Sequence, residues 1–184
     1  MTNQLEFVTG NSRKVGEATL AFGSFDITIK QVRLDIDEIQ SHDPVQISIR
    51  KATEAYRQLN KPVVINDTFW SIPALNGFPG GYMRDVAEWF SAEDFINLVR
   101  DKADKTIIMT ECVVYIDSDQ QKVITKEYLG EITLIPKGIG NSIEQVAVFN
   151  SHTLAEHHDL GQFSHKPEDY IWHDFATWYQ SAHQ

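Results

Sequence analysis

The chain has almost no cysteine, with Cys112 as the one example among 184 residues. A single cysteine excludes an intrachain disulfide and a cysteine-rich zinc site, because both need at least two thiols. Cys112 also lies within an apolar run that is typical of a strand. We therefore expect the protein to work in a reducing compartment, the cytoplasm.

Long apolar runs are also missing, since no segment approaches the roughly 20 residues that a membrane-spanning helix needs. Residues 1–6 have neither the basic cluster nor the apolar core of a secretion signal. Low-complexity stretches are absent, and the hydrophobic content of 42% is that of a globular chain. We expect one soluble domain over residues 1–184, with no membrane partner.

Positive charge is scarce, because 16 basic residues stand against 26 acidic ones and the formal net charge is −10. This balance opposes nonspecific attraction to nucleic acid and to anionic membranes. The sequence also lacks a basic face and an RNA-binding motif, which argues against a nucleic-acid-binding module. A polyanionic small ligand would therefore need a local cationic pocket.

A short β-branched run, residues 63–65, stands at the centre of the functional prediction. Its composition predicts a strand that is buried on both faces and that ends at Asn66 and Asp67. Ligands in open α/β sheets bind beyond the carboxyl ends of the strands, so Asp67 is a candidate functional acid. The alternative is that Asn66 and Asp67 only form a turn or a cap.

The N-terminal segment predicts a strand over residues 5–9, a turn, and a helix over residues 13–22 with Ser12 as its N-cap. Arg13 and Lys14 then fall in the first helical turn. Cations are disfavoured there by the helix dipole, whereas exposed N–H groups and a lysine suit a bound phosphate. Two solvated surface cations are the alternative interpretation.

Further along, alternating residues 25–36 predict one or two strands, after which Asp35, Asp37 and Glu38 cluster. These acids are either a solvated loop or hard ligands for Mg²⁺. A helix begins at Pro44, and Lys51 lies beside its apolar stripe. That lysine either reaches a cleft or extends from the helix edge into solvent.

The second half predicts helices near residues 84–90 and 92–101, then a hairpin of two long strands at residues 106–115 and 123–135. Apolar residues from Ile171 onward recur at helical spacing and predict a C-terminal helix that packs in the core or at a dimer interface.

Five segments resemble, in order and spacing, the motifs of the inosine triphosphate pyrophosphatase (Ham1-like) family: FVTGNSRK at 7–14, LDIDEIQ at 34–40, ISIRK at 47–51, NDT at 66–68 and LNGFPGGY at 75–82. The resemblance is dense over about the first 90 residues and thin afterwards. It implies an elongated α/β fold with a long mixed sheet flanked by helices, a central cleft and a homodimer. It also implies hydrolysis of purine nucleoside triphosphates with deaminated bases, such as ITP and XTP, to monophosphate and pyrophosphate.

The resemblance assigns roles residue by residue. Glu38 and Asp67 match the carboxylates that hold Mg²⁺, and Asp67 also matches the group that activates water. Lys14 matches the main cation on the triphosphate. The substrate-binding positions that the resemblance implies are Thr9, Gly10, Asn11, Ser12, Arg13, Lys14, Lys51, Thr68, Arg84, His165 and Lys166.

The sequence also departs from the family's pattern. Asn66 stands where many relatives have a second acid, and residues 141–149 lack the aromatic and the aspartate that contact the base. Lys166 replaces an arginine, so bidentate contact with a base edge is lost. These changes predict weaker discrimination among bases or a different modified nucleotide. The alternative function is a nucleotide sensor that keeps the triphosphate pocket but has lost turnover.

Overall fold

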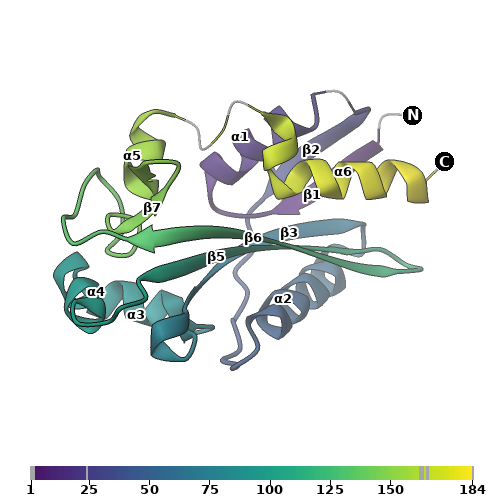
Figure 1. The fold of residues 1–184 in the computed structure, drawn as a ribbon. Coiled ribbons are helices and arrows are strands. Elements are labelled where there is room, and N and C mark those ends of the chain that lie inside the picture. Colours follow the sequence, from purple (N-terminus) through teal and green to yellow (C-terminus); the bar gives the residue numbers. More distant parts are fainter. Residues whose placement is uncertain (1–2, 24, 162–163, 165, 184) are drawn as a thin grey trace.

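The computed structural model describes residues 3–23, 25–161, 164 and 166–183. Within them, eight strands form one sheet and helices pack on both of its faces (Figure 1). The strands are β1 Asn3–Val8, β2 Ile27–Val32, β3 Val63–Ile72, β4 Phe78–Gly80, β5 Thr106–Ile116, β6 Gln121–Ile132, β7 Ala147–Phe149 and β8 His152–Thr153. The α-helices are α1 Ser12–Ala21, α2 Pro44–Leu59, α3 Met83–Trp89, α4 Ala92–Val99, α5 Leu154–Asp159 and α6 Ile171–Ala182.

The sheet is mixed, with the strand order β2-β1-β3-β5-β6-β7-β8 and with β4 paired to β3. Strand β1 is parallel to both β2 and β3, whereas β3, β5 and β6 are joined by long antiparallel ladders. The predicted hairpin is confirmed as β5 and β6, and the predicted long mixed sheet flanked by helices is confirmed with it. The alternating segment at residues 25–36 forms a single strand, β2.

Helices α1 and α6 cover one face of the sheet, and α2 covers the other (Figure 1). The alternation of side chains along β3 supplies both cores. Val64 packs beneath α1 and α6, whereas Val63 and Ile65 pack against α2. Trp172 of α6 is fully buried and meets Phe7 edge to face at 4.8 Å, so this helix is part of the core.

The helix starts explain how two functional segments are positioned. Helix α2 begins at Pro44 as predicted, and the Asp43 carboxylate caps it by accepting from the Val45 N–H. The prediction of Ser12 as the N-cap of α1 is wrong. Asn11 is the cap, and its side chain accepts from the Arg13 N–H at 2.9 Å. Asparagine and serine are comparable caps, so residue type alone did not decide between them.

The prediction that the central strand ends at Asp67 is also wrong, because β3 continues to Ile72. Its parallel pairing with β1 stops at Val64, but its antiparallel pairing with β5 continues as far as Ser71. Asp67 therefore lies inside a strand that β5 holds extended, close to where the parallel strand β1 ends. Across the described residues, no helix is long and apolar enough to span a membrane.

Candidate active site

Two adjoining cavities lie where β1 ends and α1 begins. One of about 420 Å³, here called the loop cavity, is lined by the loop Thr9 to Asn11 and by Lys51. The other, of about 320 Å³ and here called the aromatic cavity, is lined by Phe69, Trp70 and Tyr128. Four charged residues line both cavities: Lys14, Glu38, Asp67 and Arg84.

Lys14 reaches from the first turn of α1 to the middle of β3, where its Nζ donates to the carbonyl oxygen of Asn66 at 2.8 Å. Burial lowers the pKa of Lys14, against the opposing effect of Asp67 and Glu111. An anionic ligand in the cavity would counter this burial by favouring the charged ammonium. The loop beside it, in which the Asn11 N–H bonds to Thr9 Oγ1, leads into the first turn of α1 at the edge of the same cavity.

Lys51 lies between two carboxylates at the floor of the loop cavity. Its Nζ is 2.8 Å from Glu38 Oε1 and 2.9 Å from Asp67 Oδ1, and Ser48 Oγ donates to Asp67 Oδ2 at 2.8 Å. Burial acts to lower the pKa of Lys51, but Asp67 and Glu38 outweigh it and raise the pKa. The lysine that the sequence left undecided therefore reaches the cleft.

The same geometry tests whether a metal ion fits. Glu38 and Asp67 converge on one cationic group, so their oxygens can also face one divalent cation. Among the described residues no cluster of three or more metal-ligating side chains exists. Mg²⁺ is commonly held by one or two carboxylates and completes its shell with water and substrate phosphates. The two carboxylates therefore suit Mg²⁺ chemically, and their role as metal ligands stays a prediction.

Asn66 is 4% exposed, and neither polar atom of its side chain has a hydrogen-bond partner among the residues that the structure describes. A buried amide without partners is costly, by about 1–3 kcal/mol for each unsatisfied group. Asn66 also lines the loop cavity beside Lys14. Both polar atoms of this side chain are buried, so a neutral amide that is turned away from solvent stands where the resemblance would place a second acid.

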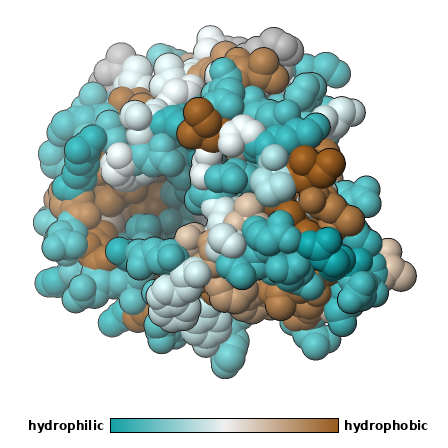
Figure 2. All heavy atoms as spheres, turned by 90° about the vertical axis from the view of Figure 1, so that its left-hand side faces the viewer, coloured by the Kyte–Doolittle hydropathy of each residue, from teal (hydrophilic) through white to brown (hydrophobic). Residues whose placement is uncertain are grey.

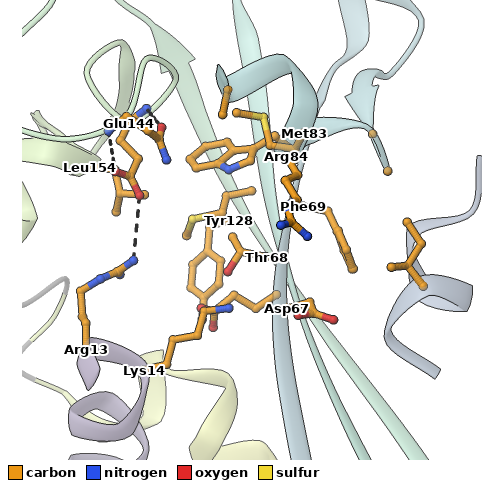
Figure 3. A pocket seen from close by; sticks show the side chains of 18 of the residues that line it. Arg13, Lys14, Asp67, Thr68, Phe69, Met83, Arg84, Tyr128, Glu144 and Leu154 are labelled. Carbon is orange, nitrogen blue, oxygen red and sulfur yellow. Dashed lines mark hydrogen bonds and ion pairs between the residues drawn. The ribbon is translucent and has the colours of Figure 1, made fainter. Parts of the chain in front are cut away.

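The wall of the aromatic cavity is built from three strands. Trp70 of β3 is opposite Met109 of β5, which is opposite Tyr128 of β6. In Figure 3 Lys14, Asp67 and Thr68 gather at one end of this cavity, and Arg13 faces Glu144 across the side nearest α1. Figure 2 shows one face of the molecule hollowed, with apolar atoms inside the hollow and polar side chains along its rim. This arrangement is typical of a small-molecule pocket.

The segment 141–149, which departs from the family's pattern, contributes little apolar surface to this cavity. Ile143 and Val146 are fully buried and pack in the core with Trp70. The segment lines the cavity with Asn141 and Glu144 instead. The resemblance aligns this segment with the family's base contacts, and the burial of Ile143 explains why that side chain does not reach the ligand space.

The predicted site residues are largely brought together. Those that line one or both cavities are Thr9, Gly10, Asn11, Arg13, Lys14, Glu38, Lys51, Asp67, Thr68 and Arg84. Within the described part of the chain, Ser12 and Lys166 line neither cavity, and Lys166 is exposed. His165 lies outside the described residues. Their roles toward a ligand stay predictions.

Sequence reasoning missed Trp70, Glu111, Tyr128 and Glu144, all of which line the aromatic cavity. The missed signal was the two-residue period of the strands. Thr68 and Trp70 share one face of β3, and their partners Glu111 and Met109 share that face of β5. Glu111 is also the one charged residue in the eleven-residue strand β5, which marks it as exceptional.

Comparisons with known proteins identify relatives of this chain. An inosine triphosphate pyrophosphatase of Candida glabrata is 30% identical over 122 residues, which make up 63% of this chain and 64% of that protein, slightly less than two thirds. A dITP/XTP pyrophosphatase of Methanopyrus kandleri is 31% identical over 133 residues, covering 72% of this chain and 71% of that protein.

The fold itself matches solved structures. A HAM1 protein from Coxiella burnetii superposes with a TM-score of 0.80 at 19% identity, covering 97% of this chain and 99% of that one. The Ham1 protein of Staphylococcus aureus gives 0.75 at 20% identity, covering 98% and 100%. A family model described as the Ham1 family matches residues 5–158. The chain belongs to the Ham1 family.

Proposed function

We propose that this protein hydrolyses nucleoside triphosphates to the monophosphate and pyrophosphate. The observation that carries the proposal is the meeting of Lys14, Lys51, Glu38 and Asp67 where a polar loop cavity joins an aromatic one. A triphosphate in the first cavity and a purine in the second would place the α-phosphorus at this junction. The names of the two relatives specify inosine triphosphate for one and dITP and XTP for the other, and both support the same substrate class.

The charges of the site suit a triphosphate despite the net charge of −10. Lys14, Lys51 and Arg84 supply the local cations, and the loop Thr9 to Asn11 lines the same cavity. The aromatic cavity offers Trp70 and Tyr128 to a base. Its lining with Glu144 in place of an aromatic supports weak discrimination among deaminated or otherwise modified purines.

In the proposed reaction Asp67 accepts a proton from water while the water oxygen bonds to the α-phosphorus. The bond from the α-phosphorus to the bridging oxygen breaks, and its electron pair leaves with pyrophosphate. Lys14 stabilises the charge that develops on the phosphate oxygens. Glu38 and Asp67 would hold Mg²⁺, which screens the phosphate charge and stabilises the leaving group. Lys51 must then move from between the carboxylates toward the phosphates.

One observation favours a second candidate, a nucleotide sensor without turnover. Both carboxylate oxygens of Asp67 are engaged, one by Lys51 and the other by Ser48. Asn66 cannot serve as a base in its place, because an amide does not take up a proton at neutral pH. If binding fails to release Asp67 from these partners, the nucleotide would bind and remain intact.

The discriminating experiment incubates the protein with ITP, XTP, GTP and ATP in Mg²⁺ and separates the products. Monophosphate and pyrophosphate in equal amounts, abolished by a chelator, are expected. Diphosphate and phosphate would show cleavage at another bond. Binding by calorimetry without any product would favour the sensor. Similar kcat/KM values across the bases would bear out the expected weak discrimination.

We also propose a cytoplasmic homodimer. The apolar side chains of Leu129, Ile135 and Ile139 are exposed and would supply a contact surface. Light scattering during size-exclusion chromatography tests this, since a mass near 42 kDa is expected for two chains of 21.0 kDa each. A mass of one chain at micromolar concentration would contradict it.

A further inference from the structure

The carboxyl of Glu111 lies in the aromatic cavity without a partner. It stands directly opposite Thr68 of β3 and Lys126 of β6, and paired residues of an antiparallel ladder carry their side chains on the same face. Both Glu111 and Thr68 line the cavity. With the residues that the structure describes, the Glu111 carboxyl forms neither a hydrogen bond nor an ion pair.

The cationic side chains near Glu111 bind other groups. Lys126 Nζ lies 2.9 Å from the Glu168 carbonyl oxygen and 3.0 Å from Asp174 Oδ2. Lys14 donates to the Asn66 carbonyl at 2.8 Å, and Arg13 pairs with Glu17 at 3.1 Å. No hydrogen bond or ion pair with the described residues therefore compensates this carboxyl, although the charges of Lys14, Arg13 and Lys126 partly offset its burial. Burial first, and then the charge of Glu17, raises the pKa of Glu111 to about 7.

The position of Glu111 along the strands indicates which part of a nucleotide it would contact. Residues on the same face of a strand recur about every 7 Å. Asn66, whose carbonyl holds Lys14, marks the phosphate end of the site, and the pair Thr68 and Glu111 follows one step further along the same face. The pair Trp70 and Met109 follows at the second step and begins the aromatic wall. Glu111 thus lies between the groups that suit phosphate and those that suit a base.

In a nucleotide the ribose lies between the phosphates and the base. We propose that Glu111 recognises the ribose by accepting hydrogen bonds from its 2′- and 3′-hydroxyl groups, so that the site prefers ribonucleotides to 2′-deoxyribonucleotides. This inference rests on the proposed function, which places the phosphates at Lys14 and the base at the aromatic wall. Two vicinal hydroxyl donors suit a carboxylate, which has two acceptor oxygens and no donor when ionised.

The expected effect follows from the cost of an unmade bond to a charged group. A hydrogen bond to an ionised acceptor contributes enough to discriminate about tenfold or more between ligands that make it and ligands that do not. The 3′-hydroxyl is common to both sugars, so the 2′-hydroxyl alone carries the preference. We expect kcat/KM to be about tenfold higher for the ribonucleotide of each pair.

The test compares ITP with dITP and GTP with dGTP at one Mg²⁺ concentration, because the members of each pair differ only at the 2′ position. Glu111→Ala should reduce the ratio of kcat/KM within each pair to about one. Glu111→Gln keeps the shape and one acceptor oxygen, and should give an intermediate ratio. Glu127→Gln is the control for the loss of one carboxylate, since Glu127 is exposed on β6 and lines neither cavity, and it should leave the ratio unchanged.

A wild-type ratio near one, or a high ratio that survives in Glu111→Ala, would overturn the inference. A change in the ratio between ITP and GTP without a change in the sugar ratio would assign Glu111 to the base and overturn it as well. Calorimetric binding of the same pairs separates this inference from the proposed function. Tighter ribonucleotide binding without pyrophosphate release would uphold sugar recognition and refute catalysis. Pyrophosphate release with equal use of both sugars would do the reverse.

Discussion

Replacing Glu111 with glutamine should stabilise the protein, and the gain should depend on pH in a defined way. Burial raises the pKa of this carboxyl from the ordinary 4.5 to about 7, and Glu17 adds to the effect. Lys14, Arg13 and Lys126 oppose it. Between pH 4.5 and pH 7 the folded protein therefore holds this proton more tightly than the unfolded chain does. The free energy of unfolding of the wild type is therefore not reduced by Glu111 at low pH, where the carboxyl is protonated. It falls as the pH rises through this window, because the buried carboxyl must ionise.

The difference of about 2.5 pH units corresponds to about 3 kcal/mol at most, because one unit is 1.36 kcal/mol. Urea unfolding of wild type and Glu111→Gln from pH 5 to pH 8 measures the difference directly. The variant should gain little near pH 5 and about 1–3 kcal/mol at pH 8. Glu127→Gln, at an exposed position on β6, controls for the loss of one negative charge. A constant difference between wild type and Glu111→Gln, or a gain that shrinks with rising pH, would refute the reasoning.

Three further changes test the metal carboxylate, the phosphate cation and the core. Glu38→Gln should raise the Mg²⁺ concentration for half-maximal activity, because a neutral amide replaces a hard anionic ligand, and an unchanged Mg²⁺ titration would remove Glu38 from the metal site. Lys14→Ala should weaken triphosphate binding much more than nucleoside binding, and equal losses in calorimetry would place this ammonium away from the phosphates. Trp172→Ala should destabilise the fold by about 3–5 kcal/mol in urea unfolding, since its side chain is fully buried, and a loss below 1 kcal/mol would contradict its place in the core.

Local signals predicted the parts of the fold that depend on local physics. Pro44 at the first helical position and the spacing of the apolar residues predicted α2, and the two long strand-like segments on either side of Asp117 predicted the hairpin of β5 and β6. The end of β3 was not predictable in this way, because β5 extends it beyond Asp67 through pairing with distant residues. The choice of Asn11 over Ser12 as a cap depended on backbone geometry that either residue type allows.

The charged end of the site was predictable because its motifs are short and continuous in sequence. Lys14, Glu38, Lys51 and Asp67 were all named in advance, and the structure brings them together. The aromatic wall was not predictable from motifs, because Trp70, Met109 and Tyr128 come from three different strands. Only the pairing register of these strands brings the three side chains together. The strand register also brings Glu111 to this wall. Only the structure shows that its carboxyl has no hydrogen bond or ion pair with the described residues.

An asparagine substitution at Asp67 tests the central claim most directly. Asp67→Asn keeps the size of the side chain and the contact with Ser48, but removes the charge that holds Lys51 and the group that would accept the proton. Pyrophosphate release from ITP with Mg²⁺ should fall by about 100-fold or more, as is typical when a general base is lost, while the circular dichroism spectrum stays that of the wild type. A folded Asp67→Asn protein that releases pyrophosphate at the wild-type rate would contradict the assignment of this carboxylate as the centre of the site.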